Sequence, residues 1–257
     1  MSTATRATSP DLWFGVDEID ATGGAGAAMT GSLVLDERHV GPDGRTAVGA
    51  LGVLVDEVLG YSLIESLPPD AWTVSTELSL DLLAPLPTTG RLIGRAHTVE
   101  VGSYAVGEVL DAEGRVLAHC RERGRRVGPA EPDAAQRQGG LPTPAAVAGG
   151  LAALLGLERD GDITRLAVVP ELENPRGVLH GGVSFAAAEL VATQARIDAG
   201  CDLATTSVHC VHTRAGAPGA TVDLRAHTVH AGRSLWVGDV TGTVDGRVVV
   251  SARVTAQ

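Results

Sequence analysis

The sequence predicts an α+β protein in which one structural motif occurs twice. Residues Arg95–Val99 read RAHTV, and the same five residues recur at Arg225–Val229. Each half also places an acidic residue inside an apolar, helix-like run, Asp56 in the first half and Glu189 in the second. A collinear series of matches is typical of an internal repeat. We therefore expect a tandem duplication, with one helix and one antiparallel sheet in each copy.

In each half, one helix precedes the strands. The run 51–67 is apolar on most sides and ends at a Pro-Pro pair, which predicts a largely enclosed helix. In the second half the corresponding run is 182–199, and Gly200 ends it. Strand-like runs follow each helix, at 73–83, 90–101, 104–111 and 116–127, and again at 204–212, 221–230, 234–244 and 247–255. An enclosed helix followed by an antiparallel meander indicates a sheet wrapped around that helix.

A change of composition marks the boundary between the halves. The segment 129–144 (PAEPDAAQRQGGLPTP) is rich in proline and contains a Gly-Gly pair, which is typical of a linker. We therefore predict an N-terminal unit at 1–128, a linker at 129–144 and a C-terminal unit at 145–257.

Charge and composition exclude several classes of function. The net charge is −11 and the pI about 5.1, so the overall field repels nucleic acid and anionic membranes. There is no signal-peptide core and no apolar run long enough for a membrane span, so we expect a soluble, cytoplasmic protein. Cys210 lies near His209 and His212, but strand alternation separates His209 from Cys210, and we predict no metal site.

The most informative segment is 174–182, which reads NPRGVLHGG. A Gly-Gly pair that opens a helix leaves backbone N–H groups pointing outward, where they can stabilise developing negative charge. Glu189 follows two turns later among apolar neighbours. An oxyanion donor and an enclosed acid on one helix indicate acyl-transfer chemistry.

This pattern resembles the hotdog-fold thioesterases, specifically the phenylacetate-pathway and 4-hydroxybenzoyl-CoA thioesterase branch. The resemblance covers essentially the whole chain as two tandem hotdog units, each an antiparallel sheet wrapped around a long central helix. It implies that the N–H of Gly181, within the loop His180–Gly182, polarises the thioester carbonyl. Asn174 is implied to assist, and Glu189 to act as nucleophile or general base. The hydroxyl of Thr193 is implied to lie near that acid.

The first half departs from the family pattern. It reads Ala47-Val48-Gly49 where the His-Gly-Gly should stand, although it retains an acid, Asp56. A β-branched residue such as Val48 cannot take the conformations open to glycine. Its Ser75 matches a family position that orients the attacking water, and Ser207 is taken as its counterpart in the second half.

In hotdog pairs the loop of one unit faces the acid of the other, so the resemblance implies two non-equivalent sites. One combines Asn174 and Gly181 with Asp56 and Ser75, and the other combines the degenerate first loop with Glu189. We predict that the first is competent and that Asp56 is the leading acid, with Glu189 retained as the alternative.

Several of these residues also have purely structural interpretations. An acid in the middle of a helix can pair with an arginine, and a Gly-Gly pair can serve close packing alone. His180 is expected to orient the loop through a backbone hydrogen bond more readily than to act as a base. Glu57, which points about 100° away from Asp56 on a helix, is expected to be paired or solvated.

Four arginines are candidates for contact with the phosphates of CoA. Arg121, Arg123 and Arg125 alternate along a predicted strand and so share one face, and Arg176 lies beside the His-Gly-Gly loop. The alternative for the three strand arginines is a charged strand edge that blocks aggregation.

The predicted function is hydrolysis of an acyl-CoA or related thioester to free acid and thiol at a composite site between the two units. No cofactor is expected, because the CoA thioester is the substrate. The main alternative is a non-catalytic acyl-CoA sensor. A hotdog dehydratase is disfavoured, because its acid stands about fourteen residues after its histidine, and here Pro175 and Pro42 occupy those positions. Closed symmetry also makes a homo-oligomer of tandem chains a reasonable expectation.

Overall fold

The protein is described by a computed structural model that covers residues 9–22, 28–68, 71–128 and 149–257. Within these residues, the strands form one twelve-stranded sheet in the order β1-β2-β4-β5-β6-β3-β9-β12-β11-β10-β8-β7, and neighbouring strands pair antiparallel. The first half contributes β1 (Val16–Thr22), β2 (Ala28–Leu35), β3 (Trp72–Leu82), β4 (Gly90–Glu100), β5 (Tyr104–Leu110) and β6 (Val116–Val127). The second half contributes β7 (Glu158–Asp160), β8 (Ile163–Ala167), β9 (Thr205–His212), β10 (Thr221–Ala231), β11 (Trp236–Val244) and β12 (Arg247–Ala256).

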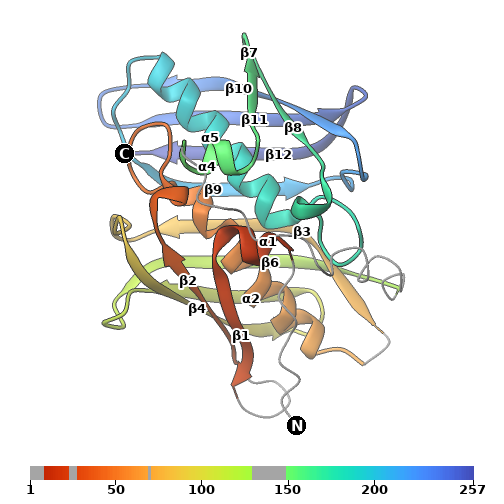
Figure 1. Ribbon diagram of the computed structural model, residues 1–257. Helices are drawn as coiled ribbons and strands as arrows, with labels where there is room; N and C mark the ends of the chain where they lie inside the picture. The colour runs from red at the N-terminus through yellow and green to blue at the C-terminus, as the bar shows by residue number, and fades with distance from the viewer. Residues whose placement is uncertain (1–8, 23–27, 69–70, 129–148) are drawn as a thin grey trace.

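Two longer helices cover one face of this sheet, as Figure 1 shows. Helix α2 (Gly52–Glu65) packs on the strands of the first half, and α5 (Gly181–Asp198) packs on those of the second. Both are enclosed because they are apolar on nearly every side, as in α2, where Leu54, Val58 and Leu59 are fully buried. Two short helices, α1 (Ser9–Phe14) and α4 (Gly150–Leu154), lie at the starts of the two described halves.

The two long helices touch through their backbones, and this contact requires glycine. A side chain at Gly182 would collide with the carbonyl group of Gly52, and a side chain at Gly52 would collide with that of Gly182. At Gly49, just before α2, an added Cβ would lie 2.9 Å from Cα of Ala186. The apolar helices therefore approach more closely than side chains would permit, and their first turns meet at the centre of the molecule.

The sheet carries the same irregularities in both halves. The two RAHTV segments lie in β4 and β10, and each ends at a β-bulge that leaves Val99 or Val229 unpaired. A second pair of bulges leaves Thr76 of β3 without a partner in β6, and Thr206 of β9 without a partner in β12. Because bulges fix register, these points relate the residues of one half to those of the other.

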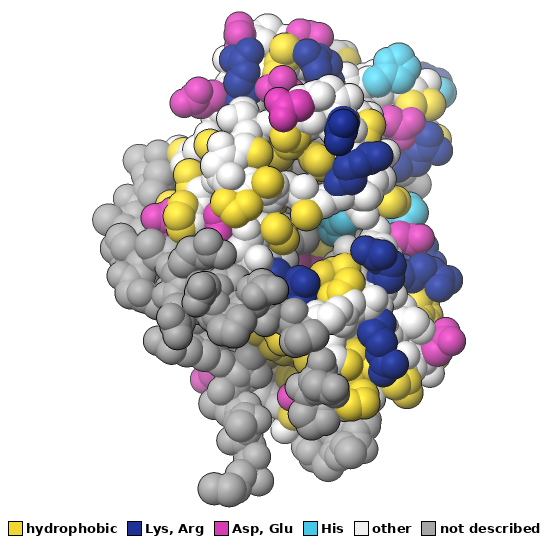
Figure 2. Space-filling view, turned by 90° about the vertical axis from the view of Figure 1, so that its right-hand side faces the viewer, with side chains coloured by type: hydrophobic (Ala, Val, Ile, Leu, Met, Phe, Trp, Pro, Cys, Tyr) yellow, Lys and Arg dark blue, Asp and Glu magenta, His cyan; other side chains and the backbone are white. Residues whose placement is uncertain are grey.

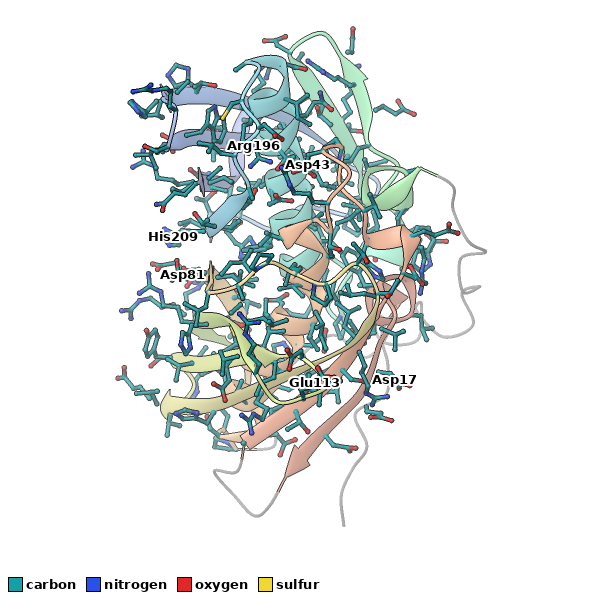
Figure 3. All side chains as sticks on the ribbon, turned by 90° about the vertical axis from the view of Figure 1, so that its left-hand side faces the viewer. Asp17, Asp43, Asp81, Glu113, Arg196 and His209 are labelled. Carbon is teal, nitrogen blue, oxygen red and sulfur yellow. The ribbon has the colours of Figure 1, made fainter. Side chains whose placement is uncertain are left out.

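Strands β3 and β9 pair with each other and join the halves into one sheet. At this junction Leu80 lies opposite Val208, and both side chains are fully buried. On the outer face of the same junction, Asp81 lies close to Ser207, and Figure 3 shows Asp81 and His209 on the side of the sheet away from the helices.

Both long helices and the eight predicted strands lie within about two residues of their predicted ends, and the α+β prediction is confirmed. Strands β1, β2, β7 and β8 were not predicted. The predicted linker at 129–144 lies outside the described residues, so the unit boundaries stay a prediction. No helix in the described ranges is long and apolar enough to cross a membrane.

Candidate active site

A cavity of about 630 Å³ lies where the two halves meet. Its walls come from α2, β3 and β6 of the first half, and from the segment before α5 and the end of β9 in the second. Three arginines, Arg125, Arg176 and Arg214, line it, and basic side chains gather on the face shown in Figure 2. The cavity thus has walls from both halves and a basic side.

The turn at 174–178 places Asn174 on the cavity wall. The N–H of Asn174 donates to the carbonyl of Val178 at 2.8 Å, and the N–H of Gly177 donates to the carbonyl of Asn174 at 2.8 Å. Gly177 has φ +72°, a conformation that favours glycine. The side-chain oxygen of Asn174 accepts from the N–H of Arg176 at 2.9 Å. The NPRG sequence therefore forms a closed turn with a fixed amide group.

Helix α5 begins at Gly181, directly against Asp56 of the other half. The N–H of Gly182 donates to Asp56 Oδ2 at 2.8 Å. A Cβ at Gly181 would lie 2.8 Å from the same oxygen, so a larger residue would displace the Asp56 carboxylate. Gly181 occupies the first helical position, where the N–H has no acceptor within its own helix. A free N–H group and a carboxylate thus lie side by side in the cavity wall.

His180 lies between two carboxylates of α2. Its Nδ1 is 3.0 Å from Asp56 Oδ2, and its Nε2 is 2.8 Å from Glu57 Oε1. Burial opposes the charged imidazole, but the contacts with Asp56 and Glu57 outweigh it and hold the pKa of His180 well above its usual value. The ring is therefore an imidazolium at neutral pH and binds both acids. Glu57 is paired, one of the two outcomes expected for it.

The pKa values of the two carboxyl groups of α2, Asp56 and Glu57, shift in opposite directions. Burial raises the pKa of Asp56, but His180, His212 and the Gly182 N–H together lower it below its usual value. Burial raises the pKa of Glu57, with the charge of Asp56 adding to that effect and His180 opposing it. Asp56 is thus the acid whose charged form the site stabilises more strongly.

Ser75 lines the same cavity, and its buried Oγ has no hydrogen-bond partner among the described residues. Sequence reasoning assigned no site role to two further residues of the cavity, His212 and Glu122. Burial lowers the pKa of His212, which lies close enough to Asp56 to interact with its charge. Burial and the charges of Asp56 and Glu57 hold the pKa of Glu122 well above its usual value.

The second acid, Glu189, occupies a related but closed place. It is 2% exposed, and its pKa is raised by burial. The N–H of Gly49 donates to its Oε2 at 3.3 Å, and the hydroxyls of Thr193 and Thr205 each donate to its Oε1 at 2.8 Å. The adjoining cavity is smaller, about 230 Å³. Every oxygen of Glu189 is therefore already used by the protein.

The loop beside Glu189, at 41–49, lacks residues equivalent to Asn174, His180 and Gly181. The turn at 41–45 closes like that at 174–178, with Gly41 N–H donating to the Arg45 carbonyl at 2.7 Å, but glycine stands where the other turn has Asn174. Ala47 and Val48 stand in place of His180 and Gly181. In addition, Arg196 reaches Asp43 at 2.9 Å, and Figure 3 shows these two side chains directed toward each other.

Three sequence-predicted residues lie away from both cavities. The hydroxyl of Ser207 donates to Asp81 Oδ1 at 2.7 Å, because the bulge at Thr206 turns Thr205 inward instead. Arg121 and Arg123 are exposed on the outer face of β6, and the Arg123 guanidinium lies 4.9 Å from the centre of the Tyr104 ring. Of the alternating arginines, only Arg125, near the end of the strand, lines the cavity.

Part of the sequence and the overall fold are similar to those of known thioesterases. The family model of the thioesterase superfamily matches residues 176–251. The 12:0-ACP thioesterase from Umbellularia californica shares the fold with a TM-score of 0.59 and 13% identity, over 90% of this chain and 94% of that one. An acyl-ACP thioesterase from Bacteroides thetaiotaomicron gives a TM-score of 0.56 and 12% identity, over 90% and 98%.

A protein from Thermobifida fusca whose structure is assigned to thioesterase II matches over 98% of this chain and 99% of that one, with a TM-score of 0.61 and 14% identity. No curated protein matches the sequence. The family match and the shared antiparallel fold confirm the resemblance to hotdog-fold thioesterases. The family match over residues 176–251 is to thioesterases, and the solved structures show that the fold is shared with them.

Proposed function

We propose that the protein hydrolyses an acyl-CoA thioester at the composite site formed by Asp56 of the first half and the His180–Gly182 loop of the second. The observation that carries this proposal is the hydrogen bond from the Gly182 N–H to Asp56. It aligns an ionised acid with the free N–H of Gly181 on the wall of a large cavity.

In this proposal the thioester carbonyl lies against the N–H of Gly181 and the amide of Asn174. Both groups stabilise the oxyanion, and loss of one such donor typically costs about 3–4 kcal/mol in the barrier. Asp56 either attacks the carbonyl carbon, breaks the C–S bond and gives an anhydride that water then cleaves, or takes a proton from a water that attacks the carbonyl carbon. In both routes CoA leaves as the thiolate, which takes up a proton to give the free thiol. Ser75, whose hydroxyl has no other partner, would orient that water.

The basic side of the cavity supports a CoA ester as the substrate. Arg125, Arg176 and Arg214 supply guanidinium groups that can pair with phosphate oxygens. Arg176 also donates to the carbonyl of Gly128 at 2.8 Å, which holds it at the cavity. The substrate brings its own CoA group, and the proposal needs no further cofactor.

We further propose that the chain is a tandem pair of hotdog units, each with one long helix and six strands. This interpretation is supported by the bulges that recur at Val99 and Val229. It is also supported by the reciprocal hydrogen bonds from Gly182 to Asp56 and from Gly49 to Glu189. The second of these sites would be structural, because its loop lacks the counterparts of Asn174 and His180 and because both oxygens of Glu189 already accept hydrogen bonds from the protein.

The test is thiol release from a panel of acyl-CoAs by the wild type, Asp56→Asn and Glu189→Gln. We expect Asp56→Asn to lose about 10²–10⁴-fold in kcat, and Glu189→Gln to retain most of its activity. Loss in Glu189→Gln alone would move the reaction to the other site. Binding of CoA esters with no release by the wild type would support the alternative of a non-catalytic sensor, which the degenerate loop at 47–49 favours.

A further inference from the structure

Glu122 is a buried acid that the proposed reaction does not use. It lies on β6, its side chain is 1% exposed, and it lines the same cavity as Asp56. Its Oε2 has no hydrogen-bond partner in the described ranges, and neither does the Oε2 of Glu57, which lines the cavity as well. Two unpartnered carboxyl oxygens, each from a side chain more than nine-tenths buried, thus border one space.

The ionisation of Glu122 makes its carboxyl group both a donor and an acceptor. Burial, together with the charges of Asp56 and Glu57, holds its pKa well above the usual value. The site therefore favours the protonated form of Glu122, which has one O–H donor and free acceptor positions. A buried polar group of this kind is costly unless it finds a partner. A partner from outside the protein must lie in the cavity, where a bound ligand can replace water.

Comparison of the halves shows that the fold does not need this acid. Two residues beyond the bulge in β3, Leu78 pairs with Glu122, and two residues beyond the bulge in β9, Val208 pairs with Val254. Val254 therefore occupies the position of Glu122, and it is fully buried. In the second half an aliphatic side chain fills this position in the core. The carboxyl group of Glu122 is therefore not required for packing.

A matching change on α2 makes room for the carboxyl group. Thr193 lies one turn after Glu189, whereas Gly60 lies one turn after Asp56. A Cβ at Gly60 would lie 3.8 Å from Glu122 Oε2, in van der Waals contact, so glycine leaves this side of the acid uncovered. The first half thus pairs Gly60 with Glu122. At the equivalent positions, the second half has the larger Thr193 and Val254.

We propose that Glu122 is a specificity-determining residue, which selects thioesters whose acyl group carries a hydrogen-bond donor, such as a hydroxyl, over those with a plain alkyl chain. The hydroxyl would pair with Glu122 and with the free oxygen of Glu57. A carboxylated acyl chain is disfavoured, because the ionised Asp56 repels it. This proposal rests on the proposed thioesterase reaction at the same cavity.

The test compares kcat/KM for alkyl, ω-hydroxyalkyl and ω-carboxyalkyl CoA thioesters of four, six and eight carbons. We expect the wild type to prefer the hydroxylated ester at one length or more, by about tenfold, and to turn over the carboxylated ester least. In Glu122→Val, which copies the second half, the hydroxyl preference should fall to about one while alkyl turnover is kept or raised. Glu122→Gln, which keeps a donor and an acceptor, should retain part of the preference.

Cys120→Val is the matched control, because Cys120 lies on the same face of β6 but does not line the cavity. Cys120→Val should keep the wild-type ratio of kcat/KM between hydroxylated and alkyl esters. An equal response of the wild type to alkyl and hydroxylated esters at all lengths would overturn the role of Glu122, as would an unchanged ratio in Glu122→Val. If the wild type released thiol from no ester, the reaction itself would fail. Calorimetry would then measure the dissociation constants of the hydroxylated and alkyl esters. The ratio of these constants in the wild type and in Glu122→Val tests the role of Glu122 without turnover.

Discussion

At the scale of single residues, the site is organised by an imidazolium held between two acids. His180 contacts Asp56 through Nδ1 and Glu57 through Nε2, and both acids come from the opposite half. This arrangement fixes the loop that contains Gly181 and keeps Asp56 ionised. Apart from the contact with an acyl hydroxyl proposed above, the effect of Glu57 on the reaction passes through His180.

We predict that Glu57→Gln lowers the pKa of His180, because it removes one of the two carboxylates that raise it. In the wild type the ring should remain an imidazolium through neutral pH. In the variant its titration should move to lower pH, which NMR of a histidine-labelled protein would follow. The control is Glu189→Gln, which should leave that titration in place. An unchanged titration in Glu57→Gln would contradict the assigned pairing.

Glu122 should weaken the fold at neutral pH. Its folded-state pKa lies well above the ordinary 4.5, so the folded state binds more protons than the unfolded state between these two values. Stability therefore falls as the pH rises from 4.5 toward the folded pKa. We predict that Glu122→Gln raises the free energy of unfolding at pH 7 by about 1–3 kcal/mol, and that the gain shrinks near pH 4.5. Urea unfolding at both pH values checks this.

At the scale of elements, the first turn of α5 combines two different requirements for glycine. Gly182 makes room for the backbone of α2, and Gly181 makes room for the carboxylate of Asp56. The second is a contact with the end of a side chain, which can shift, whereas the first is a contact with a carbonyl group, which cannot shift without moving the helix. The two positions therefore separate stability from activity.

We predict that Gly182→Ala destabilises the protein by about 1–3 kcal/mol or more, as overpacking does. Gly181→Ala should fold with nearly normal stability but lose about 10²-fold or more in kcat, because the displaced Asp56 no longer meets the substrate. Thermal unfolding and thiol release, measured on both variants, separate these effects. A normal melting temperature for Gly182→Ala would argue against the close crossing of the helices.

The sequence predicted the central elements well, because their patterns are strong. Helices α2 and α5 are long apolar runs with clear stops, and strands β3–β6 and β9–β12 are bounded by turns that contain glycine or proline. Strand β1 was missed because VDEIDAT is acidic and irregular, and its pairing with β2 shifts register after Asp17. Strand β7 has only three residues, all exposed, and offers no hydrophobic pattern.

The site was predicted only where a motif marks it. Asp56, His180 and the two glycines follow from the resemblance, but Glu122 and His212 are isolated polar residues within strands and belong to no motif. One signal was present for Glu122, since it alternates in phase with the apolar Ala118 and Cys120 and so faces inward. Ser207 was misplaced because the bulge at Thr206 shifts the alternation by one residue, which no sequence pattern announces.

At the scale of the whole molecule, the two halves share one sheet and one helix pair. The junction at Leu80 and Val208 is fully buried, and α2 packs against α5. We predict one cooperative thermal transition, with equal calorimetric and van't Hoff enthalpies. Leu80→Ala should lower the stability of the whole by about 2–5 kcal/mol without splitting the transition. Two separate transitions would show that the halves unfold independently.

The contrast between the loops at 41–49 and 174–182 has a consequence for how such a protein can change. In a dimer of identical chains, every substitution appears at both sites, so a change that improves recognition at one also alters the other. Here the donor loop and the acid are encoded in different halves of one chain. Selection can reshape the acid-bearing wall around Gly60 and Glu122 while the loop at 180–182 stays constant. In the tandem arrangement proposed above, fusion of the two units turns a symmetric pair into two sites with different roles.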